Sequence, residues 1–192
     1  MNGPSIAEPR VRHWTRDEYH HMGKLGWFRD QRVELIEGQI VQMTPQKSVH
    51  AVGIGKVDDA LRPVFGSGYW IRIQLPLIAG PRSEPEPDVA VVPGRPGDYR
   101  EHPTSALLNV EVSDTTLGHD RGKAFLYASM DVLECWIVNL VEAQLEVHRD
   151  PGPDPAARHG AGYREHRVLR GSEDIAPMAA ATAHIRVDQL LS

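Results

Sequence analysis

Cysteine is almost missing from this chain, because Cys135 is the single one among 192 residues. One cysteine forms no intrachain disulfide, so a disulfide-stabilised scaffold is excluded, and so is a zinc site built from several thiolates. We therefore expect the protein to work in a reducing compartment, the cytoplasm. A chain of this length buries a substantial core without disulfides or a structural metal.

Long apolar runs and a strong charge of one sign are also missing. No apolar run approaches the length that crosses a bilayer, and residues 1–13 carry no apolar segment typical of a signal peptide. The formal net charge of −5 argues against a dedicated nucleic-acid coat protein, although it permits a local basic surface on an enzyme. We expect no membrane partner, a flexible lead over residues 1–13 and a single domain over residues 14–192.

What the chain does contain is an ordered series of helix and strand patterns. Thr15–Glu18 has capping-box spacing and predicts a helix start, and RVELIEGQIVQM predicts an N-terminal β-hairpin that turns at Glu37–Gly38. This order predicts an α/β (α+β) fold with a mixed sheet flanked by helices. The later patterns predict a helix over residues 48–64, strands from Tyr69, over 88–92 and over 106–113, a helix over 118–130, strands in LECWIVNL and QLEVHRD, a linker or hairpin loop over 150–162, and an edge strand in YREHRVLRG.

Two of the predicted strands carry polar side chains on one face. Side chains alternate across a strand, so Glu111 in ALLNVEVS lies opposite the apolar face, and Arg72 and Gln74 in YWIRIQL share one side. Asp88 begins the strand between them in sequence. If these three strands are neighbours, Asp88, Glu111 and Gln74 converge on one face of the sheet.

Two convergent carboxylates suggest a metal site. Carboxylates that meet repel each other and are costly to keep ionised, and a divalent cation removes that cost. Mg²⁺, or Mn²⁺ in its place, takes one or two protein carboxylates and completes its shell with water and substrate phosphate. Lys123 lies on one helix stripe with Asp120 and Tyr127, and it would reach the same face to help bind phosphate or orient the attacking water.

Several segments in order resemble the Uma family of predicted endonucleases in the PD-(D/E)XK nuclease superfamily. The resemblance covers about Thr15 to Val147 and implies a restriction-endonuclease-like fold. It maps the PD motif to Pro87–Asp88 and the (D/E)XK motif to Glu111–Val112–Ser113. The segments that carry it are RVELIEGQIVQMTP, the helix start with His50, IRIQLPL, EPEPDVAVV, NVEVSDTT, DRGKAFLYA and CWIVNL.

The resemblance also assigns roles to further residues. Ser113 stands where the motif has lysine, and the family shows the same departure, with its lysine on the following helix, here Lys123. Glu34 and His50 match family positions and would complete the catalytic set with Asp88, Glu111 and Lys123. Gln74 matches the glutamine before the core strand pair, and we expect it to contact substrate.

Structural roles compete with these assignments. Glu34 fits an exposed hairpin face, His50 fits a helix start, and Lys123 could simply pair with Asp120 on a solvated helix face. Arg72 and Arg121 flank the site in sequence, and we expect them to bind phosphate backbone, although arginines in such segments are usually only solvated.

The leading hypothesis is a Mg²⁺- or Mn²⁺-dependent endonuclease that hydrolyses DNA, with the metal on Asp88 and Glu111. A second hypothesis is a binding or regulatory module that keeps the fold without catalysis, and a third is a metal-dependent hydrolase of a smaller phosphate ester. Apolar alternation on the edge hairpins predicts a dimer that covers an exposed sheet edge.

Overall fold

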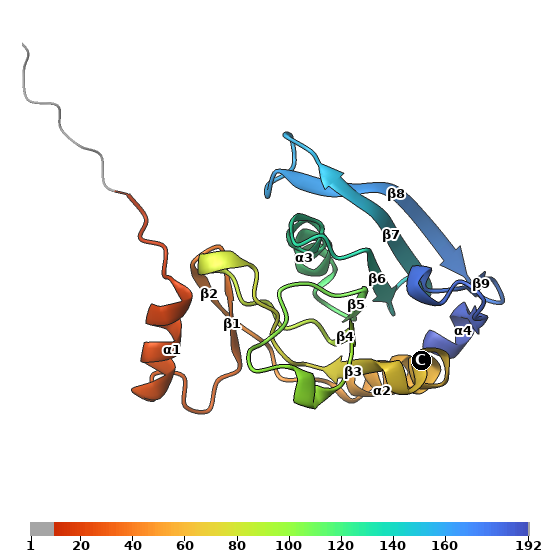
Figure 1. The fold of residues 1–192 in the computed structure, drawn as a ribbon, viewed down its shortest axis with the longest axis horizontal. Coiled ribbons are helices and arrows are strands. Elements are labelled where there is room, and N and C mark those ends of the chain that lie inside the picture. The colour runs from red at the N-terminus through yellow and green to blue at the C-terminus, as the bar shows by residue number, and fades with distance from the viewer. Residues whose placement is uncertain (1–9, 192) are drawn as a thin grey trace, which may run out of the picture.

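A six-stranded mixed sheet with helices on both faces forms the body of the protein (Figure 1). The computed structural model describes residues 10–191, so most of the predicted flexible lead, residues 1–9, lies outside the described residues. The helices and strands are α1 (Arg16–Lys24), β1 (Val33–Ile36), β2 (Gln39–Gln42), α2 (Ser48–Phe65), β3 (Tyr69–Ile73), β4 (Val89–Pro93), β5 (Leu108–Ser113), α3 (Leu117–Ser129), β6 (Glu134–Asn139), β7 (Gln144–Pro153), β8 (Ala161–Arg170), β9 (Asp174–Ile175), β10 (Ile185–Arg186) and α4 (Val187–Leu190).

The strands of the large sheet follow the order β3-β4-β5-β6-β7-β8. Neighbours are antiparallel except β5 and β6, which run parallel because α3 forms the crossover between them. The predicted adjacency of the three central strands is confirmed, since β4 pairs with β3 on one side and with β5 on the other. The predicted mixed sheet, its flanking helices and the N-terminal hairpin are likewise confirmed.

Apolar side chains form one core on each face of this sheet. One core packs α2 against the sheet, and Leu108, Val110 and Val112 of β5 belong to it together with the C-terminal α4. The other core lies under α3 and contains Tyr127 of that helix and Cys135 of β6. Because alternate residues of β5 point to opposite faces, its polar members point toward α3, as the alternation predicts.

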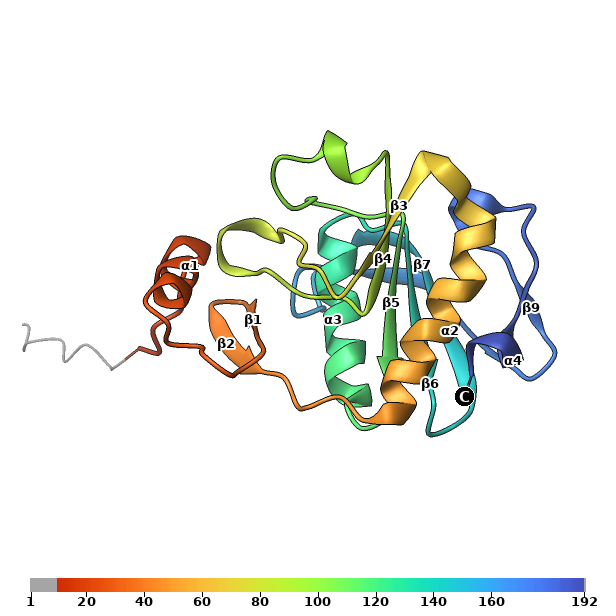
Figure 2. The same ribbon diagram turned by 90° about the horizontal axis from the view of Figure 1, so that it is seen from below.

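The N-terminal segment stands beside the sheet rather than within it. Figure 2 shows α1 and the β1–β2 hairpin at one end of the body. The predicted capping box forms, with the Thr15 hydroxyl accepting from the Glu18 amide and the Glu18 carboxylate accepting from the Thr15 amide. An isolated bridge between Leu35 and Glu84 joins the hairpin to the loop before β4, so the hairpin comes close to the polar end of the central strands.

Three boundaries differ from the sequence-based expectations. The strand predicted from Tyr69 ends at Ile73, because Gln74 adopts a left-handed backbone with φ of 49°. The predicted linker shortens, because β7 continues through the Gly/Pro segment to Pro153 and pairs there with β8. The ambiguous tail forms the short β10 and α4.

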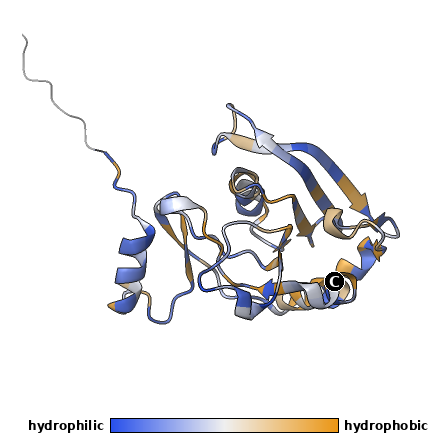
Figure 3. Ribbon diagram, in the orientation of Figure 1, coloured by the Kyte–Doolittle hydropathy of each residue, from blue (hydrophilic) through white to orange (hydrophobic). Residues whose placement is uncertain are grey.

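Hydropathy follows the layers of the fold. Figure 3 shows α1 as mostly hydrophilic, whereas hydrophobic segments lie along the helices and strands that enclose the cores. No helix in residues 10–191 is both long and apolar enough to cross a membrane. Within the same residues β3 and β8 are the edges of the large sheet. The dimer and the cytoplasmic location stay predictions.

The close approach of α2 to β5 depends on Gly53. A Cβ atom at this position would lie 2.7 Å from Cγ1 of the buried Val112, whereas one at Gly55 on the same helix would meet no atom within 4 Å. Overpacking should make Gly53→Ala destabilising by about 1–3 kcal/mol. Gly55→Ala should stabilise the helix by up to about 1 kcal/mol. Urea unfolding followed by circular dichroism measures both, and equal shifts would contradict this account of the contact.

Candidate active site

An acidic cavity of about 370 Å³ opens between the N-terminal hairpin, the start of α2 and the start of α3. Its acidic residues come from β1, the entry to β4, β5, the segment after β5, and α3. The lining includes Glu34, Asp88, Glu111, Asp114 and Asp120, together with His50, Gln74, His119 and Lys123. Polar residues of the sheet therefore line one concave site.

Asp88 is buried and held by three hydrogen bonds. The Val112 amide donates to Oδ2 at 2.8 Å, Gln74 Nε2 donates to Oδ1 at 3.2 Å, and His50 Nε2 lies 3.1 Å from Oδ1. The backbone amide of Gln74 also donates to the backbone carbonyl of Asp88 at 3.0 Å. A carboxylate only accepts, so His50 contributes Nε2–H. These contacts fix the orientation of Asp88 on the entry to β4.

Glu111 lies deeper, under α3. The Tyr127 hydroxyl donates to Oε1, and Lys123 Nζ is 2.9 Å from the same oxygen. Burial raises the pKa of Glu111 to about 8, since the nearby charges of Asp88 and Asp120 act in the same direction and Lys123 offsets only part of the effect. Burial also raises the pKa of Asp120. Glu111 and Asp120 are thus costly to ionise in this cavity.

Lys123 is buried at the centre of this cluster. Its Nζ lies 2.9 Å from Glu111 and 3.3 Å from Glu34, and it donates to the Glu86 carbonyl at 3.0 Å. Burial alone lowers the pKa of Lys123, but the carboxylates of Glu111 and Glu34 outweigh it and raise the pKa above its ordinary value. Lys123 therefore holds its proton and is a buried positive charge in the cavity.

Glu34 anchors Lys123 from the hairpin. Its Oε2 accepts from the Glu86 amide at 3.0 Å, and its Oε1 lies 3.0 Å from His119 Nε2. Burial would raise the pKa of Glu34, but Lys123 and the hydrogen bonds outweigh burial and lower it to about 2. Glu34 is thus a buried, ionised partner, and the exposed hairpin face considered from the sequence is not its environment.

His50 stands between two aspartates at the start of α2. Besides its contact with Asp88, its Nδ1 lies 3.9 Å from Asp114 Oδ1. The hydrogen bond to Asp88 raises the pKa of His50, although partial burial opposes it. This histidine therefore contributes positive charge at a pH where a free imidazole has begun to lose it.

The structure brings six of the eight residues singled out in the sequence into one cavity. They are Asp88, Glu111, Lys123, Glu34, His50 and Gln74. Sequence reasoning missed Asp114 and His119, and it treated Asp120 only as a partner of Lys123. The signals were present, since Asp114 directly follows β5 and His119 precedes Lys123 by one helical turn.

Arg72 and Arg121 are the two residues that the structure does not bring to this cavity. Arg72 is buried against the Trp70 ring at 4.8 Å, with Nη2 3.0 Å from His102 Nδ1, and it lines a separate cavity. Arg121 donates two hydrogen bonds to Glu146 on β7, at 2.9 and 2.6 Å. Position 121 faces β7 while position 123 faces the cavity, because residues two apart on a helix point in different directions.

The donor set of the cavity fits a hard divalent cation. Asp88 and Glu111 supply carboxylate oxygens to the cavity, and oxygen is the ligand atom that Mg²⁺ and Mn²⁺ prefer. In the part of the chain that the structure describes, this cavity does not hold three carboxylate, imidazole or thiolate ligand atoms within 4.8 Å of one another. A cation that uses two protein carboxylates and takes its other ligands from water and phosphate matches this arrangement.

Comparison with known proteins identifies the class of this fold. A model of the Uma2 family, described as "Putative restriction endonuclease", matches residues 16–187. A solved structure from Anabaena variabilis ATCC 29413, described as "a putative nuclease belonging to DUF820", is similar with a TM-score of 0.63 and 16% identity over 82% of this chain and 88% of that chain. A search of curated proteins finds no match. At this identity the structural similarity supports the fold.

Replacing Glu34 with glutamine should lower the free energy of unfolding at pH 7 by about 1–3 kcal/mol, because it removes a charged acceptor from a buried network. The pKa of Glu34 is lowered in the folded state, so its stabilisation is present above about pH 4.5 and is lost as the pH falls toward about 2. Urea unfolding should therefore show the difference between wild type and Glu34→Gln shrinking over that range. A difference that stays constant would contradict the assignment.

Proposed function

The chain belongs to the Uma2 family, and from this premise we propose that it hydrolyses phosphodiester bonds of DNA with the aid of Mg²⁺ or Mn²⁺. One observation carries the proposal: Asp88, Glu111 and Lys123 line a single cavity, with the carboxylates in excess over the ammonium. Perturbed pKa values in a concave site are typical of functional sites.

Asp88 and Glu111 are the residues that would hold the metal. A divalent cation bound there supplies positive charge to the phosphate and lowers the pKa of an attacking water. Asp88 is prepared for this role, because Val112, Gln74 and His50 fix both of its oxygens. Glu111 has a raised pKa, so a cation would also remove the cost of ionising it in a buried position.

Lys123 supplies a permanent positive charge beside Glu111. Since its pKa is raised, it keeps its proton during the reaction and stabilises negative charge that develops on the phosphate. Glu34 holds Lys123 in place from β1, and His50 holds Asp88 from α2. In this proposal both act as positioning residues.

The basic groups that could meet a DNA backbone differ from those expected from the sequence. Arg32 and Lys47 line the same cavity, and their side chains are 42% and 62% exposed. They pair with Glu86 and Asp114, at 3.1 and 3.3 Å. Such exposed pairs are weak, so both side chains can turn toward phosphate oxygens.

A smaller phosphate ester is the second candidate substrate. The cavity is only about 370 Å³, and the chain carries a net charge of −5, which gives little general attraction for a polyanion. The two substrate classes require the same metal chemistry, so substrate comparison distinguishes them and mutation of the site does not.

Purified protein with Mg²⁺ or Mn²⁺ should nick supercoiled plasmid DNA, and Asp88→Ala should reduce the rate by at least about 10²-fold, because a metal ligand contributes several kcal/mol to the transition state. Asp59→Asn is a matched control, since Asp59 is an exposed acid on α2 outside the cavity. A plasmid gel assay measures the rates, and calorimetry with Mn²⁺ measures binding to both variants.

Unchanged cleavage in Asp88→Ala would refute the assigned site. Cleavage of bis(p-nitrophenyl) phosphate but not of DNA would favour the smaller ester. Absence of both activities, together with no Mn²⁺ binding at millimolar concentration, would favour a binding or regulatory module that keeps the nuclease fold.

A further inference from the structure

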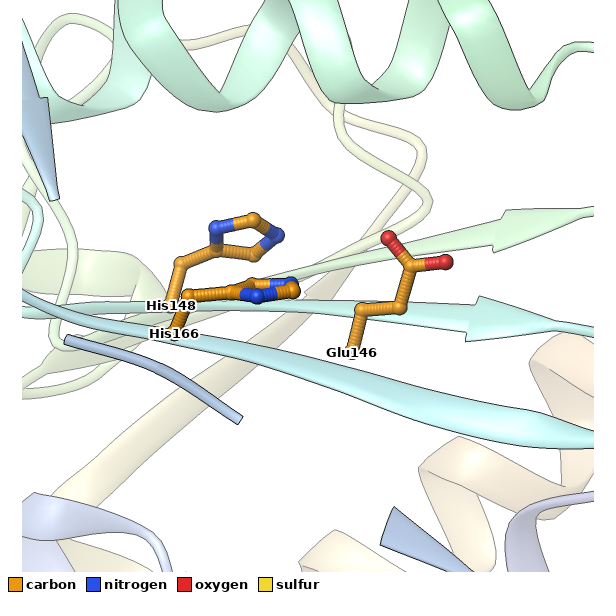
Figure 4. A group of neighbouring side chains, drawn as sticks. All are labelled: Glu146, His148 and His166. Atoms are coloured by element: carbon orange, nitrogen blue, oxygen red, sulfur yellow. The ribbon is translucent and has the colours of Figure 1, made fainter. Parts of the chain in front are cut away.

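A second cluster of metal-ligating side chains lies on the hairpin of β7 and β8, where neither histidine lines the acidic cavity (Figure 4). Glu146 and His148 come from β7, and His166 comes from β8. One ligand atom from each lies within 4.8 Å of the other two. Figure 4 shows the two imidazole rings one above the other, with the Glu146 carboxylate on the same side of the strands.

The register of the hairpin creates this cluster. His148 and His166 are direct partners in the antiparallel pairing, and their ring centroids are 4.6 Å apart. Glu146 precedes His148 by two residues, so both point to the same face of β7. Backbone pairing therefore places the three side chains on one face of the hairpin, within reach of a common ion.

His148 carries an unused ligand atom. Its Nε2 is buried and has no hydrogen-bond partner among the residues that the structure describes. Leaving a buried polar nitrogen unpaired is unfavourable. His148 and His166 both line a cavity of about 350 Å³ with Phe125 and Tyr163, so a ligand can enter beside the rings.

Neighbouring residues already orient the Glu146 carboxylate through hydrogen bonds, as happens for carboxylates that bind metals. Asn139 and Gln144 donate to Oε1 at 3.1 and 3.2 Å, and Arg121 bonds both oxygens. Glu146 Oε2 accepts its hydrogen bond from Arg121 Nε. The Arg121 side chain is 48% exposed, whereas that of Glu146 is 2% exposed, so Arg121 can turn into solvent when a cation takes its place at Oε2, while Asn139 and Gln144 keep the carboxylate in place.

We propose that Glu146, His148 and His166 form a second metal site, selective for a transition metal of the Zn²⁺ type, at which Arg121 competes with the cation for Glu146. Two imidazoles and one carboxylate suit Zn²⁺, whereas Mg²⁺ prefers an all-oxygen shell. A bound ion ties β8 to β7 at the open edge of the sheet. This inference does not rest on the proposed nuclease activity.

Zn²⁺ titration of untagged protein by calorimetry tests the site. His166→Ala should weaken Zn²⁺ binding by at least about tenfold, since even outer-shell changes have effects of that order. Arg121→Gln should strengthen it, because the competing guanidinium is removed. His184→Ala is the matched control, as His184 is an exposed histidine outside the cluster, and its affinity should equal that of wild type.

Two further measurements distinguish Zn²⁺ binding at this site from binding at the acidic cavity. Asp88→Ala should retain the Zn²⁺ affinity that His166→Ala weakens, and millimolar Mg²⁺ should not displace the ion. His166 is exposed, so its replacement should leave the circular dichroism spectrum of the apo protein unchanged. Equal Zn²⁺ affinity in wild type, His166→Ala and Arg121→Gln would overturn the proposal, and so would the absence of binding to all of them at millimolar Zn²⁺.

Discussion

The buried ammonium of Lys123 connects the parts of this structure that meet at the acidic cavity. It contacts Glu111 on β5, Glu34 on β1 and the Glu86 carbonyl before β4, while its own backbone belongs to α3. The N-terminal hairpin stands outside the main sheet, and this cluster adds a buried ion pair to the backbone hydrogen bonds that join Leu35 and Gly38 to Glu84 and Arg82. Burying such charges is costly unless each finds partners, and the convergence of three segments on the ammonium carried by α3 meets that requirement.

The same cluster leaves the site electrostatically unbalanced. Glu34 is ionised with a lowered pKa, whereas the pKa values of Glu111 and Asp120 are raised by burial and by neighbouring carboxylates. Glu111 and Asp120 are therefore the two acids that are costly to ionise in this buried position. In the proposed function, these two acids mark the part of the cluster at which a divalent cation would relieve repulsion and desolvation.

Glu111 and Lys123, the central residues of this site, could be predicted from the sequence because local strand and helix geometry determines their positions. Strand alternation placed Glu111 opposite the apolar face, and a helix stripe placed Lys123 above it. The same reasoning failed for Arg72, because contacts with Trp70 and His102 depend on how a distant loop folds over β3. It also gave no sign of the Glu146 cluster. The position of His166 beside His148 is fixed only by the register of β8, which the Pro/Gly segment before it conceals.

Helix α3 is the element that both clusters share. Lys123 points into the acidic cavity, and Arg121 points to Glu146 on β7, so the two residues fasten opposite sides of one turn. The first contact is buried on both sides, whereas the second joins a half-exposed guanidinium to a buried carboxylate. The Arg121 guanidinium can turn into solvent when another cation takes its place at Glu146, whereas the ammonium of Lys123 is enclosed by its partners. The helix is therefore fixed at the cavity and adjustable at the hairpin, and a change at Glu146 should be accommodated by Arg121 before it moves Lys123.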